Sequence, residues 1–260
     1  MPGMSDAQKA EAIRRYGAGE TVKGVASGMG FNPRTIRKAL GDGGVDVFKK
    51  EGRRLYACNE RYFQRIDTEG KAYWLGFLTA DAHMWRGVAV QLRLNGLDAG
   101  HLGKFAAAIG YDGPVTVTND GRHTARIQVG SRAMVADLAA QGCCHPGTDR
   151  HPPVIGGELV RHYLRGLFDG DGGLCDSAGR AGKPHAGISQ CGTRACVELF
   201  RQWAEAVAGT RAGCHPHRTG IWYFSTTGNR VCRRIADALY DNSTVSLDRK
   251  RLQAAALWDF

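Results

Sequence analysis

The 260-residue sequence lacks any long apolar run and any segment that resembles a signal peptide. A membrane-spanning helix needs about 20 consecutive apolar residues, and the first fifteen residues here are polar and charged instead. The eight cysteines lack the regular spacing of a small disulfide-stapled scaffold. We therefore expect a cytoplasmic protein with reduced thiols and no membrane partner.

Motifs for nucleotide cofactors, calcium and zinc are missing as well. No glycine-rich loop ends in Gly-Lys-Ser/Thr, and no dinucleotide fingerprint follows a predicted strand, so we expect no nucleotide cofactor. The run that starts at Asp169 begins like an EF-hand, but Leu174 and Arg180 stand where that motif needs glycine and glutamate. Cysteines and histidines gather at residues 143–145 and 214–217 without closing a four-ligand set, and we expect no zinc.

Acidic residues are too few to balance the basic ones. The chain has 35 Lys and Arg against 25 Asp and Glu, a net charge of +10, and about half of this surplus lies in residues 1–72. A surplus of this size attracts polyanions, of which nucleic acid is the commonest in a cytosol. The alternative is a surface charge that only keeps the protein soluble.

The first 44 residues are typical of a small helical module. Ser5 and Asn32 have the chemistry of N-caps, and the pattern predicts helices over residues 6–16, 20–27 and 33–40. The arrangement resembles the helix-turn-helix modules of resolvases and transposases, and the third helix would be the recognition helix. Its candidate DNA contacts are Arg34, Thr35, Arg37 and Lys38. The alternative is a helical cap with a solvated basic face. Residues 45–70 are predicted to be a linker and lead-in.

The rest of the chain repeats itself, which decides its architecture. The segment YWLGFLTADA at residues 73–82 aligns without a gap with YLRGLFDGDG at residues 163–172, an offset of 90. Residues 126–132 resemble residues 224–230 at an offset of 98. Each copy has the pattern of a helix, two strands, a helix, two strands and a helix. We predict an α+β fold with two pseudo-symmetric αββαββα halves, residues 71–142 and 157–260, joined by a linker over residues 143–156.

Small residues recur four positions apart in both copies of the repeated segment. Gly76 and Ala80 form one such pair, and Gly166 and Gly170 form the other. Glycine costs about 1 kcal/mol in a helix interior, so close approach of a second helix is the expected compensation. Because both copies carry the same stripe, we predict that the two helices pack against each other with their C-terminal ends side by side.

Asp81 and Asp171 close the two repeated segments. Two carboxylates at neighbouring helix C-termini oppose the helix dipoles and repel each other, so the pair needs a cation. Oxygen ligands with room for water suit Mg²⁺ or Mn²⁺, and such an ion on a basic protein can support phosphodiester hydrolysis. The alternative is that each aspartate only ends a helix.

The repeated segments resemble the two motifs of single-chain LAGLIDADG homing endonucleases. The resemblance covers about residues 57–260. It implies a DNA endonuclease whose two sheets form a saddle in the major groove and which cuts both strands of a long asymmetric site with divalent metal. By motif position it assigns the catalytic and metal-binding acids to Asp81 and Asp171, with Ala82 and Gly172 beside them at the metal. Ala82 departs from the frequent glycine and is expected to strain the helix exit through a positive φ.

Further site residues are assigned by their place on predicted strands and loops. The candidates for a polar group near the metal are Gln91, Arg93, Arg126, Ser189 and Gln190. The candidates for the DNA face are Trp85, Arg122, His123, Arg218 and Trp222. For each candidate near the metal, a contact to DNA phosphate or to solvent is an equal alternative.

Together these features predict a magnesium-dependent, site-specific double-strand DNA endonuclease that acts as a monomer. The alternative is a cleavage-inactive regulator or intron maturase of the same fold that binds DNA or RNA. Retention of both Asp81 and Asp171 favours the enzyme, because a pure binder has little use for two mutually repelling acids.

Overall fold

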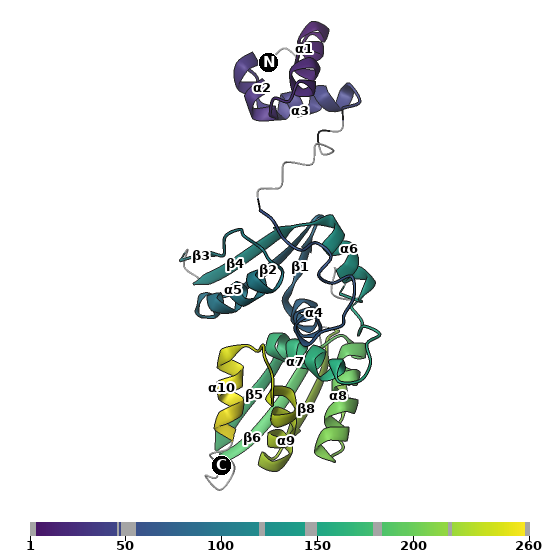
Figure 1. Ribbon diagram of the computed structural model, residues 1–260, viewed down its shortest axis with the longest axis vertical. Helices are drawn as coiled ribbons and strands as arrows, with labels where there is room; N and C mark the ends of the chain where they lie inside the picture. Colours follow the sequence, from purple (N-terminus) through teal and green to yellow (C-terminus); the bar gives the residue numbers. More distant parts are fainter. Residues whose placement is uncertain are drawn as a thin grey trace. The chain divides into compact units, whose positions relative to one another are not determined.

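The computed structural model describes residues 4–45, 47, 56–119, 123–143, 150–178, 184–217 and 220–257. The chain divides into two compact units, Met1–Leu55 and Tyr56–Phe260 (Figure 1). Within the described ranges, no helix combines the length and the apolar character needed to cross a membrane. The finer domain limits expected from the sequence stay a prediction.

The first unit contains three short helices around its own small core. They are α1 (Asp6–Gly17), α2 (Val22–Met29) and α3 (Pro33–Asp42). Ser5 and Gln8 form a capping box at α1, and the Asn32 side chain accepts a hydrogen bond from the Arg34 backbone N–H at the start of α3. Val25, Ile36 and Leu40 are fully buried between the helices. The three predicted helices are therefore present, with ends shifted by one or two residues.

The second unit begins with a half built on one antiparallel sheet of order β1-β2-β4-β3. Its elements are α4 (Glu69–Asp81), β1 (His83–Trp85), β2 (Ala89–Asn95), the 3-10 turn η1 (Gly96–Asp98), α5 (Ala99–Ala108), β3 (Thr116–Thr118), β4 (Thr124–Gly130) and α6 (Arg132–Ala140). Alternate residues of β4 are buried, which places one face of the sheet against the helices and leaves the other face outward.

The other half repeats this plan with a sheet of order β5-β6-β8-β7. Its elements are α7 (Leu159–Asp171), β5 (Gly172–Ala178), β6 (Pro184–Gly192), α8 (Arg194–Ala208), β7 (Cys214–Pro216), β8 (Trp222–Thr227), α9 (Asn229–Tyr240) and an additional α10 (Asp248–Ala256). Two matching α+β halves confirm the predicted fold class.

The two repeated segments form α4 and α7, which lie side by side between the sheets (Figure 1). A Cβ added at Gly76 would lie 2.0 Å from the carbonyl oxygen of Tyr163, and one added at Gly166 would lie 2.0 Å from that of Tyr73. A Cβ at Gly170 would lie 2.3 Å from the Cβ of Ala80. The small residues thus allow two helix backbones to touch, which brings the helix C-termini together.

The strand ladders correct one part of the sequence alignment. The offset of 90 between the repeated segments makes Gly173 of β5 the equivalent of His83 of β1. His83 pairs with Gln91 and Gly173 pairs with Ser189, so β2 and β6 are related by an offset of 98. Because Gln91 also pairs with Gln128 and Ser189 with Ser225, the β4-to-β8 offset is 97, not the 98 read from the sequence. A shift of one residue reverses which face of a strand a side chain occupies, so assignments on β8 change face.

Candidate active site

The ends of α4 and α7 bring two carboxylates together. Asp81 is the last residue of α4 and Asp171 the last residue of α7. A Cβ placed at Gly170, one residue before Asp171, would lie 3.3 Å from Oδ2 of Asp81. Both side chains are half-buried. In the part of the chain that the structure describes, no group donates a hydrogen bond to either carboxylate.

The electrostatics of the pair favour a bound cation. Burial, followed by the charge of Asp171, raises the pKa of Asp81 to about 6. Burial also raises the pKa of Asp171. An ionised pair without hydrogen-bond donors is costly unless positive charge lies beside it. The charges of Arg150 and Lys250 act to lower the pKa of both acids and so offset part of this cost. That a metal cation binds the pair stays a prediction.

Two basic side chains hold the same helix ends. Arg150 donates from Nη1 to the Ala80 carbonyl oxygen at 2.8 Å and from Nη2 to that of Ala82 at 3.2 Å. Lys250 donates from Nζ to the carbonyl oxygens of Phe168 and Gly172, both at 2.6 Å. Each cation therefore complements the negative end of one helix dipole. Burial lowers the pKa of Lys250 to about 8.

Neither Arg150 nor Lys250 was among the residues predicted from the sequence. One signal could have found them: the two stand 100 residues apart, continuing the series of offsets 90 and 98 that relates the two copies. The signal is weak because Arg150 lies in the linker between the halves, whereas Lys250 lies in α10. Their shared role is visible only in the contacts that they make.

The available ligands suit an ion such as Mg²⁺, which keeps several waters, better than an ion that takes all its ligands from the protein. No group of three or more His, Cys, Asp or Glu side chains that could hold a metal occurs among the described residues. Two carboxylates that leave room for water and phosphate oxygens match the preference of Mg²⁺. The carbonyl oxygens of Ala82 and Gly172, assigned to the metal from the motif, accept hydrogen bonds from Arg150 and Lys250 in this structure.

The expected strain at Ala82 is not present, and that prediction was wrong. Ala82 has φ −78° and ψ 146°, and Gly172 has φ −83° and ψ 164°, so both helices leave through ordinary extended backbone. No positive φ is needed at this position, and alanine costs nothing there.

A buried acid distinguishes the second half from the first. Asp169, only 1% exposed, accepts hydrogen bonds from Tyr73 Oη at 2.7 Å, Tyr240 Oη at 2.6 Å and the Leu247 backbone N–H at 2.7 Å. It thereby fastens α4, α9 and the segment leading to Lys250 to α7. At the equivalent position in α4, the uncharged Thr79 donates to the Leu75 carbonyl oxygen of its own helix, at 2.8 Å.

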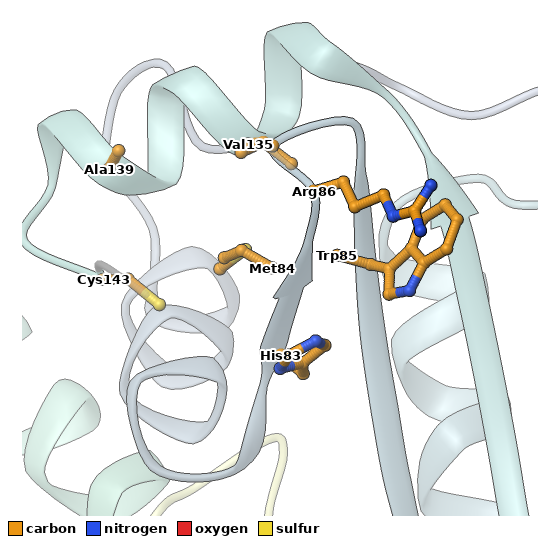
Figure 2. A pocket seen from close by; sticks show the side chains of 8 residues that line it. His83, Met84, Trp85, Arg86, Val135, Ala139 and Cys143 are labelled. Carbon is orange, nitrogen blue, oxygen red and sulfur yellow. The ribbon is translucent and has the colours of Figure 1, made fainter. Parts of the chain in front are cut away.

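The outward face of the first sheet carries long polar side chains. His83 and Trp85 point away from α6, whereas Met84 points toward it (Figure 2). Trp85 is 40% exposed, and the Arg86 guanidinium lies 4.7 Å from its ring centroid. By strand alternation Gln91, Arg93, Arg126 and Gln128 share this outward face. His123, immediately before β4, is exposed.

Several predicted residues of the second half lie elsewhere than the sequence suggested. Ser189 faces outward, but Gln190 is fully buried on the helix side and donates from Nε2 to the Cys191 carbonyl oxygen at 2.9 Å. Trp222 is also on the helix side, where the Arg194 guanidinium of α8 lies 4.8 Å from its ring centroid. Arg122 and Arg218 lie outside the described residues.

The candidate recognition helix α3 presents its basic residues to solvent. Arg34, Arg37 and Lys38 are exposed and Thr35 is half-buried, while Ile36 packs inward. This geometry is compatible with contacts to a polyanion, and the helix-turn-helix function stays a prediction.

Comparison with known proteins identifies the fold. No protein-family model and no curated protein matches the chain. Among solved structures, the I-LtrWI LAGLIDADG homing endonuclease bound to target DNA is similar with a TM-score of 0.51 and 11% identity, over 77% of this chain and 91% of that one. The LAGLIDADG homing endonuclease I-GzeII in complex with DNA target gives 0.50 and 9%, over 72% and 91%. The chain therefore has the fold of the LAGLIDADG homing endonucleases.

Proposed function

We propose that this chain is a site-specific endonuclease that hydrolyses both strands of a long, asymmetric DNA duplex with divalent metal. The observation that carries the proposal is the apposition of Asp81 and Asp171 at the ends of two glycine-packed helices, with no hydrogen-bond donor to either carboxylate among the described residues. The two structural neighbours of the same fold were solved on DNA targets, which supports duplex DNA as the substrate.

In this proposal different residues have different roles in catalysis. Asp81 and Asp171 would hold Mg²⁺ or Mn²⁺, which when bound activates water and stabilises charge on the scissile phosphate. Arg150 and Lys250 are fixed by backbone carbonyl groups at the same helix ends, so they add positive charge where a phosphodiester would approach. Because both cations are held by hydrogen bonds, they need little reorganisation when DNA arrives.

Binding is assigned to the outward sheet faces and to the first unit. Since the two faces carry different side chains, one protein molecule should recognise an asymmetric site as a monomer. Arg34, Thr35, Arg37 and Lys38 of α3 would contact DNA that flanks the cleavage site. A cleavage-inactive regulator or maturase of the same fold would gain nothing from two apposed, half-buried carboxylates, which argues for the enzyme.

The test is selection of duplexes from a randomised library with the full chain, followed by incubation of the recovered duplex with and without Mg²⁺. We expect a single asymmetric sequence to be recovered and to be cut on both strands only with Mg²⁺. Recovery of a bound sequence that is never cut, over a range of Mg²⁺ and Mn²⁺ concentrations, would favour the regulator. Failure to recover any preferred duplex would overturn the proposal.

A further inference from the structure

The two outward sheet faces differ in length and charge at equivalent positions. The ladder registers place Gln91, Arg93, Arg126 and Gln128 of the first sheet where the second sheet has Ser189, Cys191, Tyr223 and Ser225. They also place His83 and Trp85 where the second sheet has Gly173 and Cys175. The first set includes two guanidinium groups and two amides. The second set carries no formal charge.

Two arginines lie directly opposite each other on the first face. Arg93 of β2 and Arg126 of β4 are ladder partners. Like charges at directly opposed positions destabilise a sheet, and no acidic side chain forms an ion pair with either arginine within the described ranges. An arrangement of this kind is favourable when an acceptor-rich, anionic surface covers the face.

The neighbouring amides hold one of these arginines in place. Gln91 donates from Nε2 to Gln128 Oε1 at 3.0 Å, and Arg126 donates from Nη2 to the same oxygen. With the Gln91 amide turned over, its oxygen accepts from Arg126 Nε at 3.0 Å. Either orientation couples the three side chains, which lowers the entropy lost when they bind an edge of a base.

A recess of about 680 Å³ opens beside this group. Its lining includes Arg93, Arg126 and Gln128 together with Thr116, Thr118 and Thr124, so guanidinium, amide and hydroxyl groups all converge on it. Arginine binds the O6 and N7 acceptors of guanine in a bidentate manner, and glutamine does the same with adenine. The donors on this face are therefore suited to base edges in a major groove.

The strands of the second face carry no guanidinium group; their longest outward side chains are Tyr223 and the exposed His185 and His215. Ser189 and Ser225 carry only a short hydroxyl group each, and the Cys191 thiol donates to the carbonyl oxygen of Asp171 at 3.2 Å. Gln190, the long amide on this strand, is turned into the core. The strands of this face therefore offer single-point hydrogen bonds from hydroxyl and imidazole groups, which discriminate bases less well than a bidentate guanidinium group.

We infer that the two sheets contribute unequally to base recognition. The half-site against β1 to β4 is read by direct hydrogen bonds from Arg93, Arg126 and Gln128, whereas the half-site against the second sheet, whose strands carry no guanidinium group, is read with weaker base discrimination. The inference rests on the proposed function, because it concerns the same DNA-binding surface. It states which part of the DNA site determines sequence specificity, and it predicts guanine at the positions that the arginines contact.

The experiment measures binding of the full chain, without divalent metal, to the duplex recovered from the library and to every single base-pair substitution of it. We expect substitutions that weaken binding by roughly 5- to 150-fold to cluster in one half-site, at guanine-containing pairs. Substitutions in the other half-site should change the dissociation constant by less than about threefold.

Variants connect that half-site to the first sheet. The double variant Arg93→Lys and Arg126→Lys keeps both charges but loses the bidentate fork, so we expect the guanine preference to fall while binding to unrelated DNA and its salt dependence stay unchanged. The matched control makes the same change on α8, on the helix side of the second sheet: Arg194→Lys with Arg201→Lys should leave the substitution profile as in the parent protein.

Three outcomes would overturn the inference: penalties spread evenly over both half-sites, an unchanged profile in the Arg93→Lys and Arg126→Lys variant, or an equal change of profile in the α8 control variant. In each of these cases specific DNA binding would still be observed, so the proposed function would not be contradicted. A chain that prefers no duplex would instead refute the proposed function itself.

Discussion

The first half, which runs from α4 to α6, and the second half, which runs from α7 to α10, share an element order but hold their central helices differently. Asp169 connects α7 to α4, to α9 and to the segment before α10 through three hydrogen bonds, whereas the Thr79 hydroxyl donates within α4. Lys250 fastens the end of α7, and Arg150 fastens the end of α4. What the halves keep in common is the close helix contact, an acid at each helix end and a cation beside it.

Comparison of the two halves shows which features both must keep. Gly76 and Gly166 face backbone atoms of the opposite helix, so no side chain is possible at either position. Asp81 and Asp171 depend on that contact to meet. The buried supports and the sheet faces do not depend on it, and there the two halves have diverged.

The largest expected effect comes from breaking the common helix contact. In Gly76→Ala the new Cβ would meet the carbonyl oxygen of Tyr163 and the backbone nitrogen of Leu167, at 2.0 and 2.9 Å. Since backbone atoms cannot turn aside, the helices must separate, and we expect a loss of about 3 kcal/mol or more in the free energy of unfolding. Urea denaturation measures it. In the control Gly100→Ala no atom lies within 4 Å of the new Cβ, and stability should stay or rise slightly.

Substitutions at Asp169 and at its equivalent Thr79 should lower stability by different amounts. Asp169→Asn places amide hydrogens where two tyrosine hydroxyls and one backbone N–H donate, so we expect a loss of about 3 kcal/mol. Thr79→Val removes one hydrogen bond within a helix and should cost about 1 kcal/mol. Equal losses in thermal or urea unfolding would contradict the asymmetry described here.

The paired acids should make the stability of the metal-free protein depend on pH. Burial and Asp171 raise the pKa of Asp81 to about 6, above its value in the unfolded chain, so the folded state binds more protons between about pH 4 and pH 6. Stability contributed by this group is therefore lost as pH rises through that range. At pH 7 without metal, Asp81→Asn should raise the free energy of unfolding by about 1 to 3 kcal/mol. A variant less stable than the parent at pH 7 would show that the carboxylates support each other through an unrecognised partner.

Removal of the first unit should have the smallest effect on the halves. Deletion of residues 1–50 removes Arg34, Arg37 and Lys38, so we expect a footprint shortened on one side and a salt dependence reduced by up to about three units of slope. The cut positions should stay the same, because Asp81 and Asp171 are retained. An unchanged footprint and salt slope would make the first unit a structural cap.

The sequence predicted the repeated helices and missed the two cations that hold their ends. The gapless match of residues 73–82 with residues 163–172 predicted two helices in contact, because glycine destabilises a helix interior unless a second backbone packs closely against it. Arg150 and Lys250 were missed because they approach α4 and α7 from the linker and from α10, and no local pattern encodes a contact over about 70 to 80 residues.

Strand positions were harder to assign than helix positions. Trp222 was predicted for the DNA face but lies on the helix side, because side chains alternate along a strand and the residue type does not reveal the register of β8. Gln190 was taken for a site residue for a related reason: a polar residue type does not reveal that its strand position points into the core. Only the pairing of β6 with β5 and β8 determines which residues of β6 face outward.

Strand cleavage of the recovered duplex by aspartate variants tests most directly whether Asp81 and Asp171 form the catalytic centre. The full chain, Asp81→Asn, Asp171→Asn and the exposed control Asp67→Asn are incubated with that duplex and Mg²⁺, and both strands are followed on a denaturing gel. We predict that each active-site variant loses double-strand cleavage while its affinity for the duplex is unchanged or higher, because removal of a negative charge lessens repulsion of phosphate. The control should cut like the parent protein. Full cleavage of both strands by Asp81→Asn or by Asp171→Asn would contradict the assignment of the paired aspartates as the catalytic centre.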